Sequence, residues 1–208
     1  MNPQWLNWAQ RLQALAQTGL AFAKDPFDIE RYQQIQTIAA EMLAAGSGQT
    51  VEAIMELLDK QAGYATPKVD VRGVVFRDDR VLLVREKLDN GRWTLPGGWA
   101  DVGESPAQAV EREIQEEAGY QARAVKLLAL YDRNKHDHPP YIFHAYKVFF
   151  LCELVSEEHQ LVPNVETEEC GWFAEDALPE LSVGRVTAAQ IHRFFEHRRH
   201  PDWPTDFD

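Results

Sequence analysis

Apolar residues recur at intervals of three and four through about the first 62 residues and form extended runs after that point. The first pattern is typical of amphipathic helices, and the second is typical of β-strands. Asp25-Pro26 separates the first two predicted helices, Gly46-Ser47-Gly48 ends the second, and Thr50 can cap the third. We therefore assign residues 1–63 to a three-helix N-terminal segment. A core this small rarely supplies enough burial alone, so we expect the segment to pack on another domain or subunit.

Residues 67–200 are predicted to form one α/β domain. Aromatic and β-branched runs predict strands at residues 69–76, 81–85, 125–131 and 141–155, and a short strand that ends at Trp172-Phe173. Asn90-Gly91 is a strong hairpin signal. Helices are predicted after Ser105-Pro106, which can cap and start a helix, and over residues 187–197. Residues 201–208 are expected to be a loosely ordered C-terminal tail.

The helix after Ser105 carries three glutamates on one face. Glu113, Glu116 and Glu117 stand at i, i+3 and i+4, so their carboxylates project in the same direction. Like charges at these spacings destabilise an isolated helix by roughly a few tenths of a kcal/mol per pair. A hard divalent cation gives a reason for the arrangement, since it takes carboxylate oxygens and is completed by substrate phosphates. The stripe therefore predicts a Mg²⁺ or Mn²⁺ site, and a solvated acidic helix face is the alternative.

The region around this stripe resembles the Nudix box, G-x5-E-x7-R-E-U-x-E-E-x-G-U, in which U is a bulky aliphatic residue. The matching positions are Gly98, Glu104, Arg112, Glu113, Ile114, Glu116, Glu117 and Gly119. Tyr120 departs from the final aliphatic position, which alters packing and leaves the chemistry untouched. The resemblance implies a Nudix α/β/α sandwich with a mixed central sheet, preceded here by a small all-α domain. It also implies hydrolysis of a nucleoside diphosphate linked to another moiety, X.

The resemblance places the metal on the glutamate helix. Glu113 and Glu117 are the expected inner ligands, and Glu116 completes the cluster. The carbonyl of Gly97 is a candidate neutral ligand. Glycines at Gly97 and Gly98 let the backbone approach the metal closely.

Two further roles follow from the box and from the loop that comes after the central strands. Arg112 cannot bind a metal, so we expect it to orient a glutamate, Glu104, through a bidentate pair; an ordinary surface ion pair is the alternative. The base that deprotonates water is either Glu113 or, by resemblance, an acidic residue of the later loop. In that loop we favour Glu166 and then Glu169, with a solvated acidic loop as the alternative.

Five basic residues are candidates for substrate binding. Lys135, His136 and His138 lie in a polar loop between two predicted strands and could reach the substrate phosphates or the X group. A zinc site there is discounted, because no third ligand converges on the histidines. Arg72 and Arg85 lie on predicted strands that lead to the site and are further phosphate candidates.

Composition narrows the class of protein. The 33 acidic and 21 basic residues give a formal net charge of −12, which argues against non-specific binding of nucleic acid or anionic membranes. A phosphate substrate remains compatible, because bound metal ions invert the charge of a carboxylate site. No run of 18 apolar residues and no signal-peptide pattern occurs, so a cytoplasmic protein is expected. Cys152 and Cys170 are expected to be buried free thiols.

The N-terminal helices resemble those of a Nudix subfamily with an extra helical domain. This resemblance implies CDP-choline as substrate, with ADP-ribose close behind, and the products would be a nucleoside monophosphate and phosphorylated X. Hydrolysis of nucleoside triphosphates or dinucleoside polyphosphates, and a non-catalytic nucleotide sensor, are the alternatives. The N-terminal helices are expected to build a homodimer. A helix-turn-helix DNA reader is disfavoured, because the segment has few clustered Lys or Arg.

Overall fold

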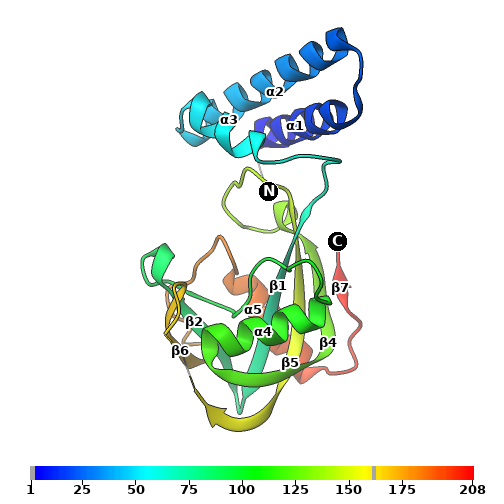
Figure 1. The fold of residues 1–208 in the computed structure, drawn as a ribbon. Helices are drawn as coiled ribbons and strands as arrows, with labels where there is room; N and C mark the ends of the chain where they lie inside the picture. The colour runs from blue at the N-terminus through cyan, green and yellow to red at the C-terminus, as the bar shows by residue number, and fades with distance from the viewer. Residues whose placement is uncertain (1–2, 161–162) are drawn as a thin grey trace. The chain divides into compact units, whose positions relative to one another are not determined.

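A computed structural model of the chain describes residues 3–160 and 163–208 (Figure 1). The chain divides into two compact units. The first contains Met1–Lys68 together with Pro140–His144, and the second contains Val69–Pro139 and Ala145–Asp208. The strand predicted over residues 141–155 begins at Ala145 instead, and the residues before it, Pro140–His144, belong to the first unit.

The first unit contains the three predicted helices, α1 (Gln4–Phe22), α2 (Pro26–Ser47) and α3 (Val51–Asp59). The Asp25 side chain caps α2 by accepting hydrogen bonds from two backbone N–H groups of its first turn, and Thr50 caps α3. Gly48 ends α2 with φ of 72°, a left-handed conformation that favours glycine. The core is Leu6, Ala9, Ala40, Leu43, Ala44, Ile54 and Leu58, with Trp5 and Ile142 packed against it.

A mixed sheet forms the centre of the second unit, with strand order β3-β2-β1-β5-β4-β7, and β6 also pairs with β2. The strands are β1 (Lys68–Arg77), β2 (Arg80–Glu86), β3 (Trp93–Thr94), β4 (Tyr120–Asp132), β5 (Ala145–His159), β6 (Thr167–Ala174) and β7 (Asp206–Phe207). The pairs β1/β2, β2/β3, β2/β6 and β4/β5 are antiparallel, whereas β4/β7 is parallel. Both cysteines are free thiols; Cys152 is buried and Cys170 is half-buried.

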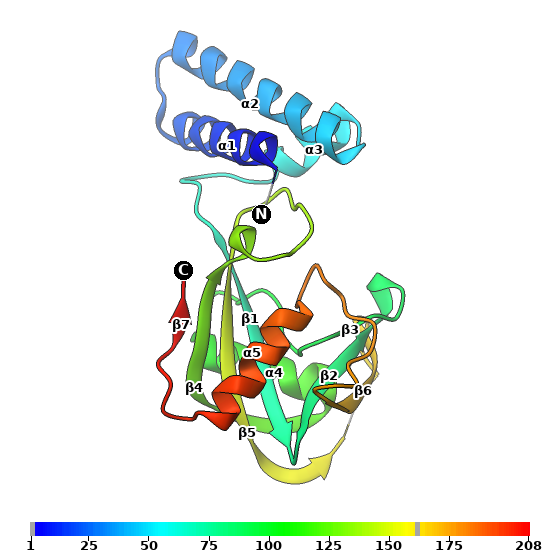
Figure 2. The same ribbon diagram turned by 180° about the vertical axis from the view of Figure 1, so that it is seen from behind.

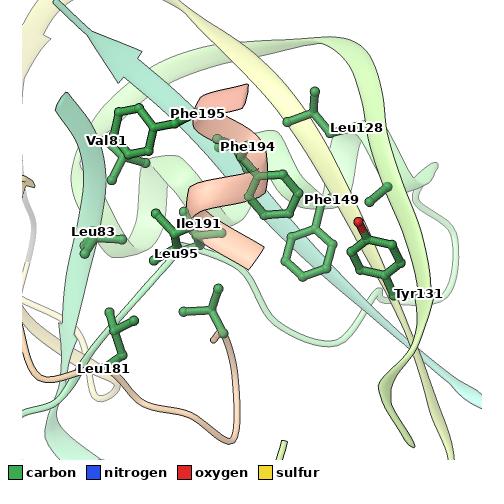
Figure 3. Close-up of a cluster of buried hydrophobic side chains, with 13 residues drawn as sticks. Val81, Leu83, Leu95, Leu128, Tyr131, Phe149, Leu181, Ile191, Phe194 and Phe195 are labelled. Carbon is green, nitrogen blue, oxygen red and sulfur yellow. The ribbon is translucent and has the colours of Figure 1, made fainter. Parts of the chain in front are cut away.

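One helix covers each face of this sheet, as Figures 1 and 2 show from opposite sides. Helix α4 (Pro106–Ala118) packs Val110 and Ile114 onto one face. Helix α5 (Ala188–Arg199) packs on the other face, where the ring of its Phe194 contacts that of Phe149 of β5, with 4.8 Å between the ring centroids (Figure 3). The α/β/α sandwich implied by the sequence is confirmed.

Helix α4 has the start and stop that the sequence predicts. Ser105 and Gln108 form a reciprocal capping box, and Gly119 ends the helix with φ of 71°. Strand β4 begins immediately afterwards at Tyr120, five residues before the predicted start. The Tyr120 ring is buried, with its centroid 5.7 Å from that of Trp172, so the bulky residue at this position serves packing.

The expectation of a loosely ordered tail over residues 201–208 is wrong. Strand β7 pairs with β4, and the Lys126 ammonium donates hydrogen bonds of 2.7 Å to two carbonyls of the tail. Arg193 of α5 makes a bidentate contact with Asp206. These partners lie well before the tail in the chain, so local sequence composition does not report them.

Candidate active site

The glycine-containing loop at residues 95–100 runs beside β1 like an additional strand. Backbone hydrogen bonds of 2.8 to 2.9 Å join Gly73 to Pro96, Val71 to Gly98 and Ala100 to Val69. A Cβ on Gly97 would lie 2.0 Å from the carbonyl oxygen of Val71, and the φ of 141° is itself unfavourable for other residues. Glycine is therefore required at this position for the loop to lie so close to β1.

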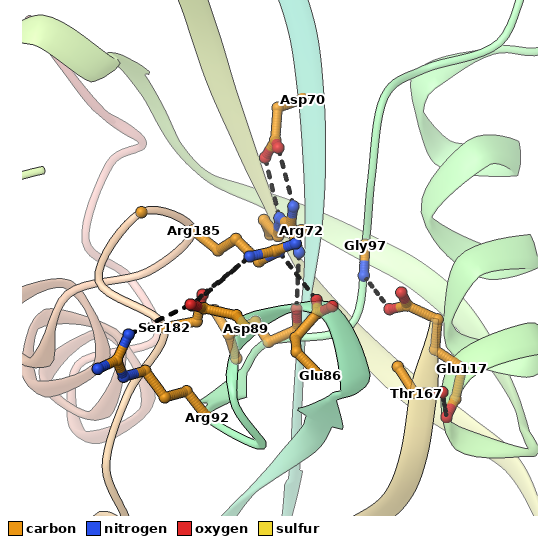
Figure 4. Close-up of polar contacts among 12 residues, drawn as sticks. Asp70, Arg72, Glu86, Asp89, Arg92, Gly97, Glu117, Thr167, Ser182 and Arg185 are labelled. Atoms are coloured by element: carbon orange, nitrogen blue, oxygen red, sulfur yellow. Dashed lines mark hydrogen bonds and ion pairs between the residues drawn. The ribbon is translucent and has the colours of Figure 1, made fainter. Parts of the chain in front are cut away.

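Three carboxylates converge next to this loop. Glu113 and Glu117 come from α4 and are buried, whereas Glu166 is exposed on the segment before β6. One oxygen from each lies within 4.8 Å of the others. The backbone N–H of Gly97 donates a 2.8 Å hydrogen bond to Oε2 of Glu117 (Figure 4). Glu116 is not in this triplet, and its carboxylate instead accepts from Arg112 at 3.0 Å.

Burial controls the protonation of the two buried glutamates. Burial raises the pKa of Glu117 to about 8, against the opposing effects of Arg72 and of the Gly97 N–H. Burial also raises the pKa of Glu113, although Arg112 opposes the shift. Carboxylates held together in this way suit a hard divalent cation, which takes oxygen ligands and favours their ionised form. The donor set therefore fits Mg²⁺ or Mn²⁺.

Arg112 connects the carboxylates of the box. Its Nε and Nη2 donate to both oxygens of Glu104 at 3.0 to 3.2 Å, which is the pairing expected from the sequence. Its Nη1 donates to Glu113 and to Glu116, each at 3.0 Å. Glu104 makes the largest contribution to the raised pKa of this guanidinium. Arg112 thus stays charged and fixes the orientation of Glu113.

A turn that the sequence analysis overlooked places Glu166 beside the helix. The Asn164 side-chain oxygen accepts from the backbone N–H groups of Glu166 and Thr167 at 2.9 and 2.7 Å. The Thr167 hydroxyl donates to the carbonyl of Glu117 at 3.1 Å, and the Lys87 N–H donates to the carbonyl of Glu166 at 2.8 Å. The Asn-x-x-Thr spacing is a turn signal that could have indicated this arrangement.

Arg72 lies inside the domain. Its Nε and Nη2 donate to both oxygens of Asp70 at 2.9 Å, and Nη1 donates to the carbonyl of Leu95 at 3.1 Å (Figure 4). The buried Lys147 ammonium donates to the same Asp70 carboxylate at 2.7 Å. Two buried cations therefore share one carboxylate. The charge of Arg72 also makes the largest contribution among those that lower the pKa of Glu117 and so oppose the effect of burial. The sequence analysis missed Asp70 and Lys147.

Arg85 and Glu169 contact one another at the surface. Arg85 Nη1 lies 3.1 Å from Glu169 and 3.6 Å from Glu168, and its Nε donates to the carbonyl of Gly91 at 3.0 Å. Of the two candidate bases in this loop, the structure thus brings Glu166 to the buried glutamates and pairs Glu169 with Arg85.

The three candidates in the polar loop differ in accessibility. Lys135 is exposed in the short 3₁₀ turn η2 (Arg133–Lys135). His136 lies 3.2 Å from the Asp208 carboxylate, and its ring centroid is 4.0 Å from that of Tyr131. His138 is buried, with Nδ1 at 2.7 Å from the carbonyl of Val183. Burial lowers the pKa of His138 to about 4.

The carboxylate triplet, the glycine loop beside it and Arg112 thus form a site on the α/β/α sandwich whose oxygen donors suit a divalent cation, the kind of site used by enzymes that act on phosphates. Residues 66–194 match the NUDIX domain, and residues 3–58 match a domain described as "UDP-X-like, N-terminal oligomerisation domain". The chain belongs to the Nudix hydrolase family and is a Nudix pyrophosphohydrolase.

Three relatives match much or nearly all of the chain. It is 46% identical, over 99% of its length and 97% of the relative's, to a Bacillus subtilis (strain 168) protein named "Putative ADP-ribose pyrophosphatase YjhB". It resembles the crystal structure of an ADP-ribose pyrophosphatase from Streptococcus suis 89-1591, with a TM-score of 0.62 and 42% identity, over 69% of this chain and 100% of that one. It also resembles the crystal structure of a UDP-X diphosphatase, with a TM-score of 0.62 and 36% identity over 98% of both chains.

Across residues 3–160 and 163–208, none of the helices has both the length and the apolar character that a membrane crossing requires.

Proposed function

We propose that the enzyme hydrolyses a nucleoside diphosphate linked to X, of the ADP-ribose or UDP-X type, to a nucleoside monophosphate and phosphorylated X. The Glu113/Glu117/Glu166 triplet is the observation that carries the metal-dependent chemistry. The names of the relatives support the substrate class, since they mention ADP-ribose and UDP-X. CDP-choline, which the N-terminal resemblance implied, receives no specific support from these names.

Mg²⁺ or Mn²⁺ is the proposed cofactor, with Glu113 and Glu117 as carboxylate ligands and the Gly97 carbonyl as a further candidate. A bound divalent cation would neutralise charge on the pyrophosphate and lower the pKa of a coordinated water. Arg112 would keep Glu113 oriented through the contacts described above. Glu116 is proposed to act indirectly, since its carboxylate accepts a hydrogen bond from Arg112.

Glu166 is the proposed base, because it is the exposed member of the triplet and can face a water molecule. Glu166→Gln is expected to lower kcat by about 10²- to 10⁴-fold, the usual contribution of a general base. Glu169→Gln is the matched control, since it neutralises a nearby glutamate that pairs with Arg85. Equal losses in the two variants would contradict the assignment.

Lys135, His136 and Arg85 are the proposed contacts for phosphates or the X group, because their side chains are at least partly exposed. His136→Ala is expected to change the ranking of substrates more than the best rate. An unchanged ranking would show that His136 does not contact the substrate and that this loop is an ordinary surface loop.

We also propose that the active form is a homodimer assembled through α1. Trp8, Leu15 and Phe22 recur at intervals of seven, lie on one side of α1, and are exposed. Apolar side chains gathered on one helix face mark an interaction surface. The match of residues 3–58 to an oligomerisation domain supports a second copy of this chain as the partner.

The function is tested by a release assay with Mg²⁺ or Mn²⁺ and a panel of ADP-ribose, UDP-sugars, CDP-choline, dinucleoside polyphosphates and nucleoside triphosphates. Preferential cleavage of a linked nucleoside diphosphate, lost in Glu117→Gln, is the expected result. Preference for a nucleoside triphosphate or a dinucleoside polyphosphate would show that the substrate is not a nucleoside diphosphate linked to X. Binding without turnover would instead favour a nucleotide sensor.

A further inference from the structure

Arg185 lies in the loop between β6 and α5 and directs its guanidinium toward the 3₁₀ turn η1 (Lys87–Asp89) (Figure 4). Its Nε is 2.9 Å from a Glu86 carboxylate oxygen. Its Nη1 donates to the Ser182 hydroxyl at 3.1 Å and lies 3.7 Å from Asp89. Among the residues that the structure describes, Nη2 has no hydrogen bond or ion pair. The side chain is 32% exposed, so a ligand can reach it.

Glu86 connects this arginine to the carboxylate triplet. Its side chain is almost fully buried, and in the sheet it is the register partner of Thr167, whose hydroxyl bonds to the carbonyl of Glu117. The next residue, Lys87, donates its N–H to the carbonyl of Glu166. The backbone at Glu86 and Lys87 therefore pairs with the segment that carries Glu166, and Thr167 of that segment is hydrogen-bonded to the backbone of Glu117.

Two arginines that act on the triplet, Arg72 and Arg112, use all of their guanidinium nitrogens on protein oxygens. Arg72 is buried and uses three nitrogens on protein oxygens. Arg112 contacts the carboxylates of Glu104, Glu113 and Glu116. Arg185, like Arg85, combines solvent exposure with a guanidinium nitrogen that has no protein partner among the described residues; unlike Arg85, it is held by a buried carboxylate, that of Glu86.

We propose that Arg185 is a substrate-binding residue that contacts a phosphate of the linked nucleoside diphosphate, while Glu86 acts as a positioning residue that holds Nε. A planar guanidinium fixed at one edge presents its remaining N–H groups to phosphate oxygens in a defined direction. The proposal rests on the proposed function and adds to it a phosphate contact made by the protein itself, outside the Nudix box.

The test compares Arg185→Gln with Arg92→Gln. Arg92 belongs to the same network, with Asp89 at 3.2 Å and Glu180 at 2.8 Å, so its variant controls for loss of an ion pair in this loop. Arg185→Gln is expected to raise KM for the preferred substrate at least about tenfold, the effect of losing roughly 1.4 kcal/mol of binding. Arg92→Gln is expected to stay within about twofold of wild type, and Arg185→Lys should recover part of the loss.

Two binding measurements distinguish a direct phosphate contact by Arg185 from an indirect effect through the carboxylates. Mn²⁺ alone, titrated in the absence of nucleotide, should bind Arg185→Gln as it binds wild type; a parallel loss of Mn²⁺ affinity would show that Arg185 acts through the carboxylates and would overturn the proposal. Calorimetric binding of ADP-ribose and a UDP-sugar does not depend on turnover. If wild type binds but cleaves nothing, the proposed function fails, and weaker binding by Arg185→Gln still supports the phosphate contact. Equal KM and equal nucleotide affinity in Arg185→Gln and Arg92→Gln would refute it.

Discussion

The backbone N–H of Gly97 points at the carboxylate of Glu117, with 2.8 Å between the nitrogen and Oε2. The contact joins a loop held against β1 to a residue of helix α4 that lies 20 positions later in the chain. It occupies one carboxylate oxygen and favours its ionised form, which leaves the other oxygen for a cation. The glycine loop therefore helps to organise the metal site through its amide as well as through any carbonyl ligand.

Gly97→Ala is expected to disrupt this arrangement. The new Cβ would meet the backbone oxygen of Val71 at 2.0 Å, and backbone cannot move aside as a flexible side chain can. Overpacking and the unfavourable φ together should cost about 2 to 5 kcal/mol of unfolding free energy, measured by chemical denaturation. Gly184→Ala is the control, because a Cβ there meets nothing within 4 Å. If the two variants unfold alike, the close approach of the loop to β1 is not required for stability.

Glu117→Gln should separate metal binding from folding. The amide oxygen of glutamine can still accept from Gly97, so the thermal midpoint should change little, while loss of the charged ligand should lower metal-dependent turnover at least about 100-fold. Glu116→Gln removes a half-exposed carboxylate that pairs with Arg112, and a loss below about tenfold is expected. Mn²⁺ titration alongside turnover checks both. A near-normal rate in Glu117→Gln would overturn the ligand assignment.

The sequence predicts best what depends on neighbours along the chain. Helix α4 is bounded by the Ser105 cap and Gly119, and the i, i+3, i+4 spacing fixes the direction of its glutamates. The succession of strands and helices along the chain follows from periodicity, and the mixed sheet with a helix on each face follows from the Nudix resemblance. These features need no knowledge of which distant residues meet.

The predictions that fell short depend on distant contacts. Arg72 has the spacing of an ordinary strand residue, and only the fold reveals that it shares Asp70 with Lys147, 77 residues further along the chain. Glu116 and Glu117 are indistinguishable as charges, yet helix rotation points one toward Arg112 and the other into the triplet. The loose order expected of residues 201–208 is wrong because Lys126 donates hydrogen bonds to two carbonyls of this segment and β7 pairs with β4.

His138 should make stability depend on pH. The carbonyl of Val183 can only accept, so Nδ1 carries a proton and donates it. Nε2 lies 3.2 Å from the Gln190 amide nitrogen and accepts from it, and this second contact requires a neutral ring. Burial lowers its folded pKa to about 4, whereas the unfolded histidine takes up a proton below about 6.5. Since the unfolded state binds more protons between these values, stability is lost as the pH falls from about 6.5 to about 4, by up to about 1.4 kcal/mol per pH unit.

His138→Gln removes the titrating group and keeps a side chain that can form hydrogen bonds. The variant should be less stable than wild type at pH 7.5, and the difference should shrink by pH 5. Urea denaturation of both proteins at the two pH values measures how much of the unfolding free energy each loses between pH 7.5 and pH 5. Parallel pH dependences for the two proteins would assign the acid sensitivity to other groups.

Substitutions on α1 should dissociate the proposed homodimer without unfolding the helical unit. Leu15 and Phe22 are 63% and 68% exposed, so Leu15→Lys combined with Phe22→Lys places charge where a second copy is expected to bury apolar surface, and the unit's own core stays intact. Fully burying each side chain is worth about 1.5 to 3 kcal/mol and a homodimer contains two copies of each, so the dimer should weaken by at least roughly 10⁴-fold. Light scattering over a dilution series should then give the mass of one chain, while Val155→Lys, an exposed apolar position on β5, should retain the dimer mass. A double variant with the wild-type mass at every concentration would move the interface away from this face of α1, and a wild type that is monomeric throughout would remove the dimer itself.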